Sequence, residues 1–194
     1  ESWYAYFPGI KVVMPSTPAD AKGLLKSAIR DDDPVIFIEQ ERMYGNKGEV
    51  PDDPDFTIPL GVADVKREGT DCTIVARSLM VPLALKAAEQ LQEQGVSCEV
   101  IDPRTIRPLD IDTIIESVKK TNRVVLAEES HPICGVNAEI SHEIMQFAFD
   151  YLDAPIKRVS GADVPMPYAK NLEQLAVPDV ERIVAAVREV AYLN

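Results

Sequence analysis

Apolar and polar residues follow one another in a strand-helix-strand order at the start of the chain. Residues 12–14 form a short apolar run, and Thr17 and Pro18 then supply an N-cap and a proline at the first helical position. Apolar residues recur at offsets 0, 3, 4, 7 and 8 from Ala21, which predicts one buried helical stripe. Residues 35–38 are continuously apolar and β-branched or aromatic, which is typical of a strand buried on both faces. Residues 1–45 are therefore predicted to hold a fragment too small to fold as a separate domain.

The pattern is interrupted between residues 46 and 69, where Gly, Pro and Asp dominate and no helical period is sustained. We interpret this stretch as an ordered linker that crosses between two parts of the protein. One short strand is predicted inside it, near residues 56–58.

Strand and helix patterns alternate again from residue 70 to residue 194, which we predict to be a complete second domain. An alternation of this kind favours an α/β fold with an open, mostly parallel sheet and helices on both faces. The last helix is expected to follow Pro178. The predicted strands are residues 72–76, 98–102, 123–127 and 156–159.

Composition and charge narrow the class of protein. The chain has 194 residues, of which 46% are hydrophobic, and this is ample for a packed core. Its net charge of -12 repels phosphate backbones and anionic lipids, so nucleic acid and membrane surfaces are excluded as expected partners. Three widely spaced cysteines without a CxxC pattern indicate a reducing compartment. No apolar run reaches the roughly 18 residues of a membrane span.

The acidic turn after the first long helix is a candidate cation site. Arg30 is followed by three aspartates, and the partial negative charge of the helix C-terminus disfavours anions there. The free carbonyl oxygens of the last helical turn and Asp31 would form an oxygen-only site for a hard, weakly held metal ion. The alternative is a solvated acidic turn that tolerates the repulsion.

Two further groups of residues have side chains that could serve catalysis, but the sequence favours a structural role for each. His131 lies three residues before Cys134, but no orienting carboxylate has a recognisable spacing, which favours a polar turn. Glu39 and Glu41 are two residues apart after a buried strand, where carboxylates are more often solvated than catalytic.

Arg104 and Arg107 follow the predicted strand 98–102, at the sheet edge where open α/β folds usually contact anions. We favour the alternative that they pair with Asp102 or Asp110, and we expect the segment to position the interface between the two domains.

Three segments carry a family resemblance. They are residues 8–16 (PGIKVVMPS), residues 21–31 (AKGLLKSAIRD) and residues 161–170 (GADVPMPYAK). The last has two prolines around Met166, which allow no helix and shape an apolar loop that usually covers a core edge or meets another chain. The chain resembles, over nearly its whole length, the β subunit of the thiamine-diphosphate-dependent pyruvate dehydrogenase E1 component.

The resemblance implies a fold and a division of the chain. Residues 1–45 would be the C-terminal fragment of a pyrimidine-binding domain, and residues 46–69 the linker. Residues 70–194 would be a transketolase C-terminal-type domain with a five-stranded sheet. Glu1 is not an initiator methionine, and aromatic residues open the chain without an element to pack them, so we expect a piece of a longer protein.

The resemblance also implies an activity. The whole enzyme would oxidatively decarboxylate pyruvate with thiamine diphosphate and acetylate the lipoyl domain of the E2 acyltransferase. The family's catalytic histidine and its cofactor-activating glutamate match positions before Glu1, so this chain alone is expected to be inactive, with no catalytic and no cofactor-binding residue of its own. The β subunits of branched-chain 2-oxoacid and acetoin dehydrogenases share the fold and remain alternatives.

Partners and metals are implied in the same way. The expected partners are an E1 α subunit, which would hold magnesium and the diphosphate, and a second β subunit in a heterotetramer of two α and two β chains. A further partner is the basic subunit-binding domain of E2, for which the chain would be a non-catalytic docking module. In the family a potassium ion occupies the acidic turn. The matching positions are Ala28, Ile29, Asp31 and Asp33. The resemblance places the protein in a bacterial cytoplasm or a mitochondrial matrix.

Overall fold

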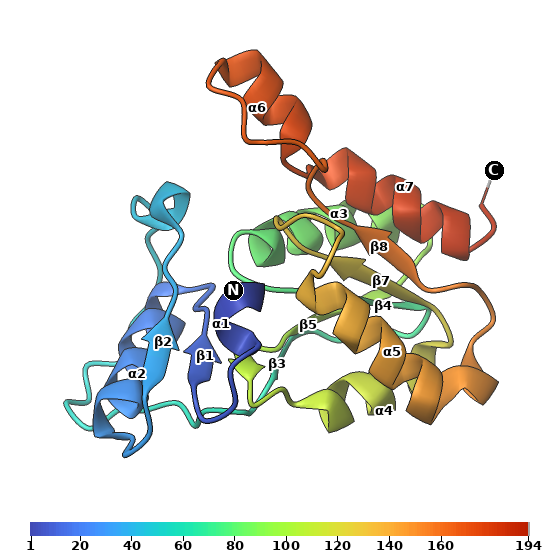
Figure 1. Cartoon of the computed structure of the whole chain (residues 1–194). Helices are drawn as coiled ribbons and strands as arrows, with labels where there is room; N and C mark the ends of the chain where they lie inside the picture. The colour runs from blue at the N-terminus through green and yellow to red at the C-terminus, as the bar shows by residue number, and fades with distance from the viewer. Residues whose placement is uncertain (194) are drawn as a thin grey trace.

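The computed structural model describes residues 1–193, and these form two unequal parts (Figure 1). The small part, residues 1–60, carries two strands, one long helix and two short helical turns. The main domain, residues 61–193, carries the remaining elements. The small part comprises α1 (Ser2–Ala5), β1 (Lys11–Val13), α2 (Pro18–Arg30), β2 (Val35–Phe37) and η1 (Glu41–Met43).

The main domain is built on a five-stranded sheet in the order β3-β5-β4-β7-β8. Strands β5, β4, β7 and β8 run parallel, and only the edge strand β3 is antiparallel to its neighbour β5. The open, mostly parallel sheet that the sequence predicted is therefore confirmed. The strands are β3 (Asp64–Arg67), β4 (Cys72–Ala76), β5 (Cys98–Asp102), β7 (Val124–Ala127) and β8 (Lys157–Val159).

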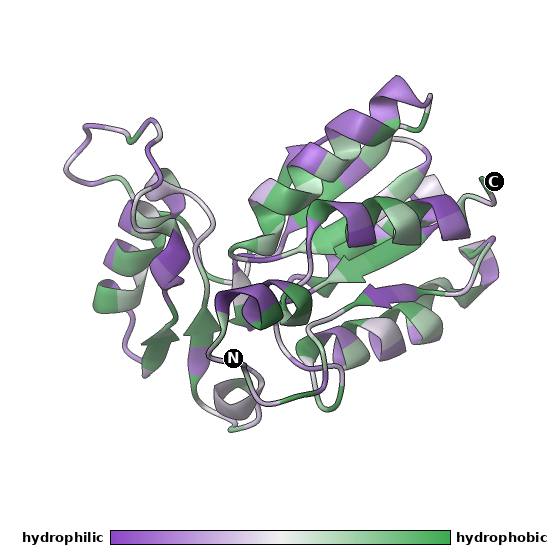
Figure 2. Ribbon diagram, turned by 90° about the horizontal axis from the view of Figure 1, so that it is seen from above, coloured by the Kyte–Doolittle hydropathy of each residue, from purple (hydrophilic) through white to green (hydrophobic). Residues whose placement is uncertain are grey.

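Helices cover both faces of this sheet (Figures 1 and 2). Alternate residues of a strand point to opposite faces. Ile74 of β4 therefore packs among α3 and α7, while Val75 packs among α4 and α5. Burial on both faces explains why β7 is continuously apolar in the sequence and β4 nearly so. The helices are α3 (Met80–Glu93), α4 (Ile111–Thr121), α5 (Val136–Ala148), which is followed by the turn η2 (Phe149–Tyr151), and α7 (Val180–Val190).

A second, three-stranded sheet joins the two parts. Its order is β2-β1-β6, with β1 parallel to β2 and antiparallel to β6 (Thr105–Arg107), a strand of the main domain. The helix α2 packs on this sheet, and Leu24 forms a small buried cluster with Val13 and Ile58. The division of the chain at residues 45 and 69 stays a prediction, since strands from both sides of the linker pair in one sheet.

Local signals in the sequence fix where the helices begin. The side chain of Thr17 accepts a hydrogen bond from the backbone N–H of Asp20, and Pro18 opens α2 as expected. Asp110 caps α4 in the same way by accepting from the N–H of Thr113. The predicted start of α2 is confirmed.

The linker differs from its prediction. Residues 56–58 do not form a strand. Instead Phe56 and Ile58 lie against α2, so close to Gly23 that a Cβ there would come within 2.6 Å of the Ile58 side chain. The strand of this stretch is β3, which pairs with the edge of the main sheet. Apolar packing of Phe56 and Ile58 on a helix has no period that distinguishes it from a short strand.

Residues 161–176 form an arm that stands away from the main domain (Figure 1). Its first half has no regular helix, as its two prolines predict, and its second half is α6 (Lys170–Ala176). Ala176 is the one buried residue of α6, and Tyr168 is fully exposed. The arm therefore adds almost nothing to the core of this chain.

Candidate functional site

In the acidic turn predicted to hold a cation, two of the three aspartates are already paired with a lysine. The Nζ atom of Lys11 lies 2.7 Å from Asp31 Oδ2 and 3.1 Å from Asp33 Oδ2. Hydrogen bonds with Lys11 lower the pKa of Asp31, and the bonds with both aspartates raise the pKa of Lys11. Lys11 thus supplies the positive charge that the helix C-terminus and its aspartates require.

The oxygen atoms proposed as potassium ligands have the right chemistry for a hard cation. Within residues 1–193 no hydrogen bond reaches the carbonyl oxygens of Ala28 and Ile29, and the carboxylate of Asp31 lies at the same turn. Carbonyl and carboxylate oxygens suit such an ion. No group of three or more His, Cys, Asp or Glu residues that could hold a metal ion occurs in the described part of the chain. Potassium at this turn therefore stays a prediction, and Lys11 would compete with it.

A buried ion pair lies where two parallel strands of the main sheet end. Arg77 follows β4 and Glu128 follows β7, and the guanidinium of Arg77 donates to Glu128 Oε2 at 2.7 Å. Glu128 also accepts from Ser160 Oγ at 2.8 Å and from the backbone N–H of Asn137 at 3.2 Å. Glu128 is completely buried and Arg77 almost so. Charges this deep are stable only when they are paired and hydrogen-bonded.

Arg77 also holds the start of the chain against the main domain. Its Nη2 atom donates to Glu1 Oε1 at 2.8 Å, and Ser130 Oγ donates to the same oxygen at 3.0 Å. Burial of Glu1 opposes its ionisation, but the charge and hydrogen bond of Arg77 outweigh burial and lower the pKa of Glu1. We call Glu1, Arg77, Glu128, Ser130 and Ser160 the arginine junction.

A second set of charges joins the two parts on another side, and we call it the aspartate junction. Asp20 of α2 lies 2.9 Å from Lys66 Nζ and 3.5 Å from Arg104 Nη1. Asp64 lies 2.6 Å from the same lysine nitrogen. The members of the aspartate junction are Ser16, Asp20, Asp64, Lys66, Asp102 and Arg104.

Asp102 is the carboxyl group of this junction whose ionisation is most strongly opposed by burial. Complete burial raises its pKa to about 6, although a hydrogen bond from Ser16 Oγ and the charge of Lys66 act in the opposite direction. Lys66 lies 3.9 Å from Asp102, beyond hydrogen-bonding distance. Burial opposes the charge of Lys66 as well, but its bonds to Asp64 and Asp20 raise its pKa.

Both arginines of the segment after β5 contact the small part or the linker. The side chain of Arg104 lies near Asp20 and donates to the carbonyl oxygen of Val62 at 3.0 Å, and Arg107 donates to the carbonyl oxygen of Ala5 at 2.6 Å. Neither side chain forms the expected ion pair with Asp102 or Asp110. The guanidinium of Arg104 lies near Asp20 and Asp64 instead, and only its backbone N–H donates to Asp102, at 2.9 Å. The segment lies at the interface between the two parts, as the sequence predicted.

The remaining candidates are dispersed. His131 Nδ1 lies 2.7 Å from the carbonyl oxygen of Ala162 at the base of the arm, whereas the thiol of Cys134 is exposed. Glu39 accepts a hydrogen bond from Tyr44, and Glu41 opens η1. These contacts place each residue in a local turn rather than in a shared constellation.

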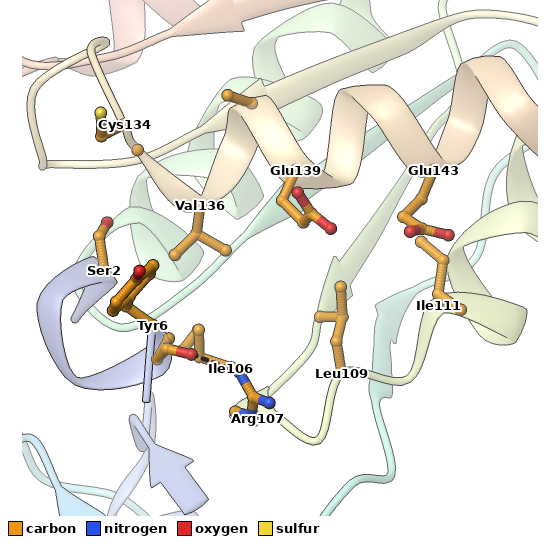
Figure 3. A pocket seen from close by; sticks show the side chains of 13 residues that line it. Ser2, Tyr6, Ile106, Arg107, Leu109, Ile111, Cys134, Val136, Glu139 and Glu143 are labelled. Carbon is orange, nitrogen blue, oxygen red and sulfur yellow. Dashed lines mark hydrogen bonds between the residues drawn. The ribbon is translucent and has the colours of Figure 1, made fainter. Parts of the chain in front are cut away.

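A groove runs between α1, the segment after β6 and the first half of α5 (Figure 3). Its volume is about 690 Å³. Tyr6, Val136 and Ile106 line one end, and Glu139 and Glu143 point from α5 toward Leu109 and Ile111 at the other end (Figure 3). One end of the groove therefore combines apolar side chains with Arg107, and the other end is acidic.

The arginine junction was missed by the sequence analysis, although a signal was present. Arg77 and Glu128 each directly follow a continuously apolar run. Neighbouring parallel strands end at the same edge, and Ala76 pairs with Ala127 in the register of the sheet. An arginine and a glutamate at the next positions must then lie side by side. Lys11 and Lys66 had no comparable signal, because their partners come from distant segments.

Comparisons with known proteins agree with this architecture. Residues 61–183 match the family model "Transketolase, C-terminal domain", and residues 1–47 match "Transketolase, pyrimidine binding domain". The chain belongs to the transketolase C-terminal domain family. No helix within residues 1–193 is long and apolar enough to cross a membrane.

Curated relatives are similar over nearly the whole chain. A protein of Rhizobium meliloti (strain 1021) named pyruvate dehydrogenase E1 component subunit beta is 56% identical over 191 residues, which are 98% of this chain and 42% of the relative. The subunit of that name from Rickettsia felis is 54% identical over 191 residues, 98% of this chain and 58% of its own length. The mitochondrial pyruvate dehydrogenase E1 component subunit beta-1 of Arabidopsis thaliana is 53% identical over 194 residues, which cover 98% of this chain and 53% of the relative. The chain spans about half the length of these relatives.

A solved structure confirms the fold. The "Split gene transketolase, inactive beta4 tetramer" superposes with a TM-score of 0.79 at 29% identity, and covers 99% of this chain and 60% of its own. The α/β architecture with a transketolase C-terminal-type domain is thereby confirmed.

Proposed function

We propose that this chain is part of the β subunit of a thiamine-diphosphate-dependent E1 component that oxidatively decarboxylates pyruvate and acetylates the lipoyl domain of E2. The observation that carries the proposal is the identity of 53–56% over 98% of the chain with proteins named pyruvate dehydrogenase E1 β subunits. The order of the two matched domain families supports it.

In this proposal the chain contributes position rather than reactive groups. The two junctions fix the pyrimidine-binding fragment against the C-terminal-type domain through Arg77 on one side and Lys66 and Arg104 on the other. Thiamine diphosphate, when bound by the whole enzyme, supplies the carbanion chemistry. Magnesium and the diphosphate are assigned to the α subunit, since this sequence has no Gly-Asp-Gly motif. The chain alone is then inactive.

The proposed assembly is a heterotetramer with two E1 α subunits and a second β subunit. The exposed apolar side chains of the arm support a contact with another chain, since apolar patches of this kind mark interaction sites. A related fold is named as a tetramer of β chains. The proposed location follows the relatives, which are bacterial or mitochondrial.

Potassium at the acidic turn belongs to the same proposal. Its ligands would be the carbonyl oxygens of Ala28 and Ile29, the side chain of Asp31 and a carbonyl or carboxylate oxygen of Asp33. The unbonded carbonyls support the site. The ammonium group of Lys11 would have to move before the ion could bind Asp31.

Docking on the basic subunit-binding domain of E2 is a second candidate function, which the net charge of -12 favours. It is compatible with the first. Docking by charge predicts that the affinity of this chain for an isolated subunit-binding domain falls as salt is added. Affinity that is independent of salt would count against it.

A chimera tests the main proposal. The segment of the Rhizobium meliloti relative that aligns with this chain is replaced by residues 1–194, and the product is combined with the α subunit of the same organism. We expect thiamine-diphosphate-dependent turnover of pyruvate in preference to branched-chain 2-oxoacids and acetoin. A preference for one of the other substrates would favour the alternative dehydrogenases. An assembled but inert chimera would contradict the proposal.

A further inference from the structure

The aspartate junction has more acidic than basic side chains. Among the described residues, three carboxylates and two basic groups face one another there. They are Asp20 of α2, Asp64 and Lys66 of β3, and Asp102 and Arg104 at and after the end of β5. If all three carboxylates were ionised, a largely buried site would keep one negative charge without a partner, which is costly. One additional proton makes the site neutral.

The hydroxyl group of Ser16 shows where this proton belongs. Ser16 Oγ lies 3.1 Å from Asp20 Oδ2 and is also in hydrogen-bonding contact with Asp102 Oδ2. A hydroxyl group has one hydrogen, so it can donate to only one of the two carboxylates. Between two ionised carboxylates, the other contact would join two oxygen atoms without a hydrogen. When Asp102 is protonated, it donates to Ser16 Oγ and Ser16 donates to Asp20, so both contacts are hydrogen bonds.

Asp102 takes the proton rather than its neighbours. Asp20 accepts hydrogen bonds from Thr17 Oγ1 at 2.7 Å and from Lys66 Nζ at 2.9 Å, and these lower its pKa although burial opposes its ionisation. The side chain of Asp64 is 39% exposed and lies 2.6 Å from the same lysine. Asp102 is completely buried and lies 3.9 Å from Lys66, and burial raises its pKa to about 6.

We propose that the chain Asp102–Ser16–Asp20 holds one buried proton that fastens the small part to the main domain, and that loss of this proton as pH rises weakens the docking. Asp102 ends β5 of the main domain, whereas Ser16 and Asp20 belong to the small part. The hydrogen bond between Asp102 and Ser16 therefore crosses between the two parts. Because all of these groups lie within this chain, the inference is independent of the proposed function.

Nuclear magnetic resonance of the 13C-labelled chain tests the position of the proton. The Cγ signal of Asp102, identified by its absence from the Asp102→Asn variant, is followed from pH 4 to pH 8. We expect a midpoint near pH 6. A midpoint near 4, the ordinary value for an aspartate, would show that Asp102 is ionised at neutral pH and would overturn the proposal.

Two substitutions separate the hydrogen-bonded chain from an effect of net charge. Asp20→Asn removes the charge that draws the hydrogen of Ser16 away from Asp102, so the midpoint should fall by about one pH unit. Asp64→Asn removes the same charge from Lys66 but no partner of Ser16, and should shift the midpoint less. In a Ser16→Ala background the effect of Asp20→Asn should shrink toward that of Asp64→Asn. Equal effects with Ser16 in place would reduce the shift to net charge and contradict the chain.

Hydrogen exchange tests whether the proton controls docking. Backbone amides of α2 should be less protected than those of β4, because the small part opens without the main sheet. From pH 5 to pH 7 the protection of α2 should fall about tenfold, as expected for a carboxyl group whose pKa is about 6 when docked and 3.8 when exposed. Asp102→Asn should abolish this fall. Asp112→Asn, which removes an exposed carboxylate of α4, should leave it unchanged.

Three results of the exchange measurement would overturn the proposal. Protection of α2 that does not change between pH 5 and pH 7 would show that the proton does not stabilise docking. An equal fall in the Asp102→Asn variant would place the responsible proton on another group. Equal protection of α2 and β4 would show that the two parts open together, so that no separate docking step exists.

Discussion

The small part and the main domain of this protein are stabilised by different interactions. The main domain buries apolar side chains on both faces of a five-stranded sheet, in two large clusters. The small part has a buried cluster of its own with only Val13, Leu24 and Ile58 among the described residues. It is held by strand pairing between β1 and β6, by the two charged junctions, and by Val12 and Met14, which are buried in one of the clusters of the main domain. Charged contacts should therefore contribute more to the docking of the small part than to the stability of the main sheet.

The strongest test of this difference is to break the arginine junction. Arg77→Met leaves the buried carboxylate of Glu128 without its charge partner, and we expect the free energy of unfolding to fall by about 3–5 kcal/mol. Urea unfolding followed by circular dichroism measures it. Lys86→Met on the exposed face of α3 removes the same charge and should change stability by less than about 0.5 kcal/mol. Equal effects of the two substitutions would contradict the account.

The aspartate junction should make stability depend on pH. The pKa of Asp102 is raised from 3.8 to about 6 in the folded chain. Between these values the folded state binds the proton more tightly than the unfolded state, so this group's contribution is lost as pH rises from about 4 to 6. A shift of two units corresponds to about 3 kcal/mol.

Asp102→Asn removes this titration. The stability of the variant relative to the unsubstituted chain should therefore increase between pH 4 and pH 7, as measured by urea unfolding at each pH. If the stabilities of the two proteins differ by the same amount at every pH, Asp102 ionises in the folded chain as it does in the unfolded chain, which would contradict the prediction. Asn keeps the size of the side chain, so such a constant difference would come from packing and hydrogen bonding alone.

The backbone of Gly69 lies against the backbone of β5 at the edge of the main sheet, and a substitution there should have a smaller effect on stability. A Cβ at Gly69 would overlap the backbone of Cys98 and Glu99 at the start of β5. Gly69→Ala should cost about 1–3 kcal/mol, the usual effect of overpacking. Gly45→Ala in the small part, where no atom lies within 4 Å of the added Cβ, is the matched control. Thermal unfolding that is unchanged by Gly69→Ala would show that the edge strand shifts freely.

The smallest expected effect concerns the acidic turn. Lys11→Met removes the ammonium group that competes for Asp31 and Asp33, so added potassium should raise the Tm of this variant by a few degrees more than that of the unsubstituted chain. Sodium at equal ionic strength controls for screening. Lys22→Met, which removes a lysine bound to the Pro51 carbonyl, should show no potassium dependence. An equal rise of the Tm in potassium and in sodium would contradict a potassium site and favour a solvated acidic turn.

Elements with a strong period were predictable from the sequence, and contacts between distant segments were not. The four parallel strands and the cap at Thr17 follow from local patterns that the structure confirms. The pairing of β1 with β6 and the contact of Lys66 with Asp20 join residues more than forty positions apart. No local signal specifies such contacts. The contact of Arg77 with Glu128 is predictable in part, because the two residues follow neighbouring parallel strands that end at the same edge of the sheet.

Calorimetric titration with thiamine diphosphate in the presence of magnesium tests most directly whether this chain is a scaffold that leaves the cofactor to other segments. We predict no heat of binding to the chain alone, and saturable binding to the chimera combined with its α subunit. Stoichiometric binding of thiamine diphosphate by the isolated 194-residue chain would contradict the account.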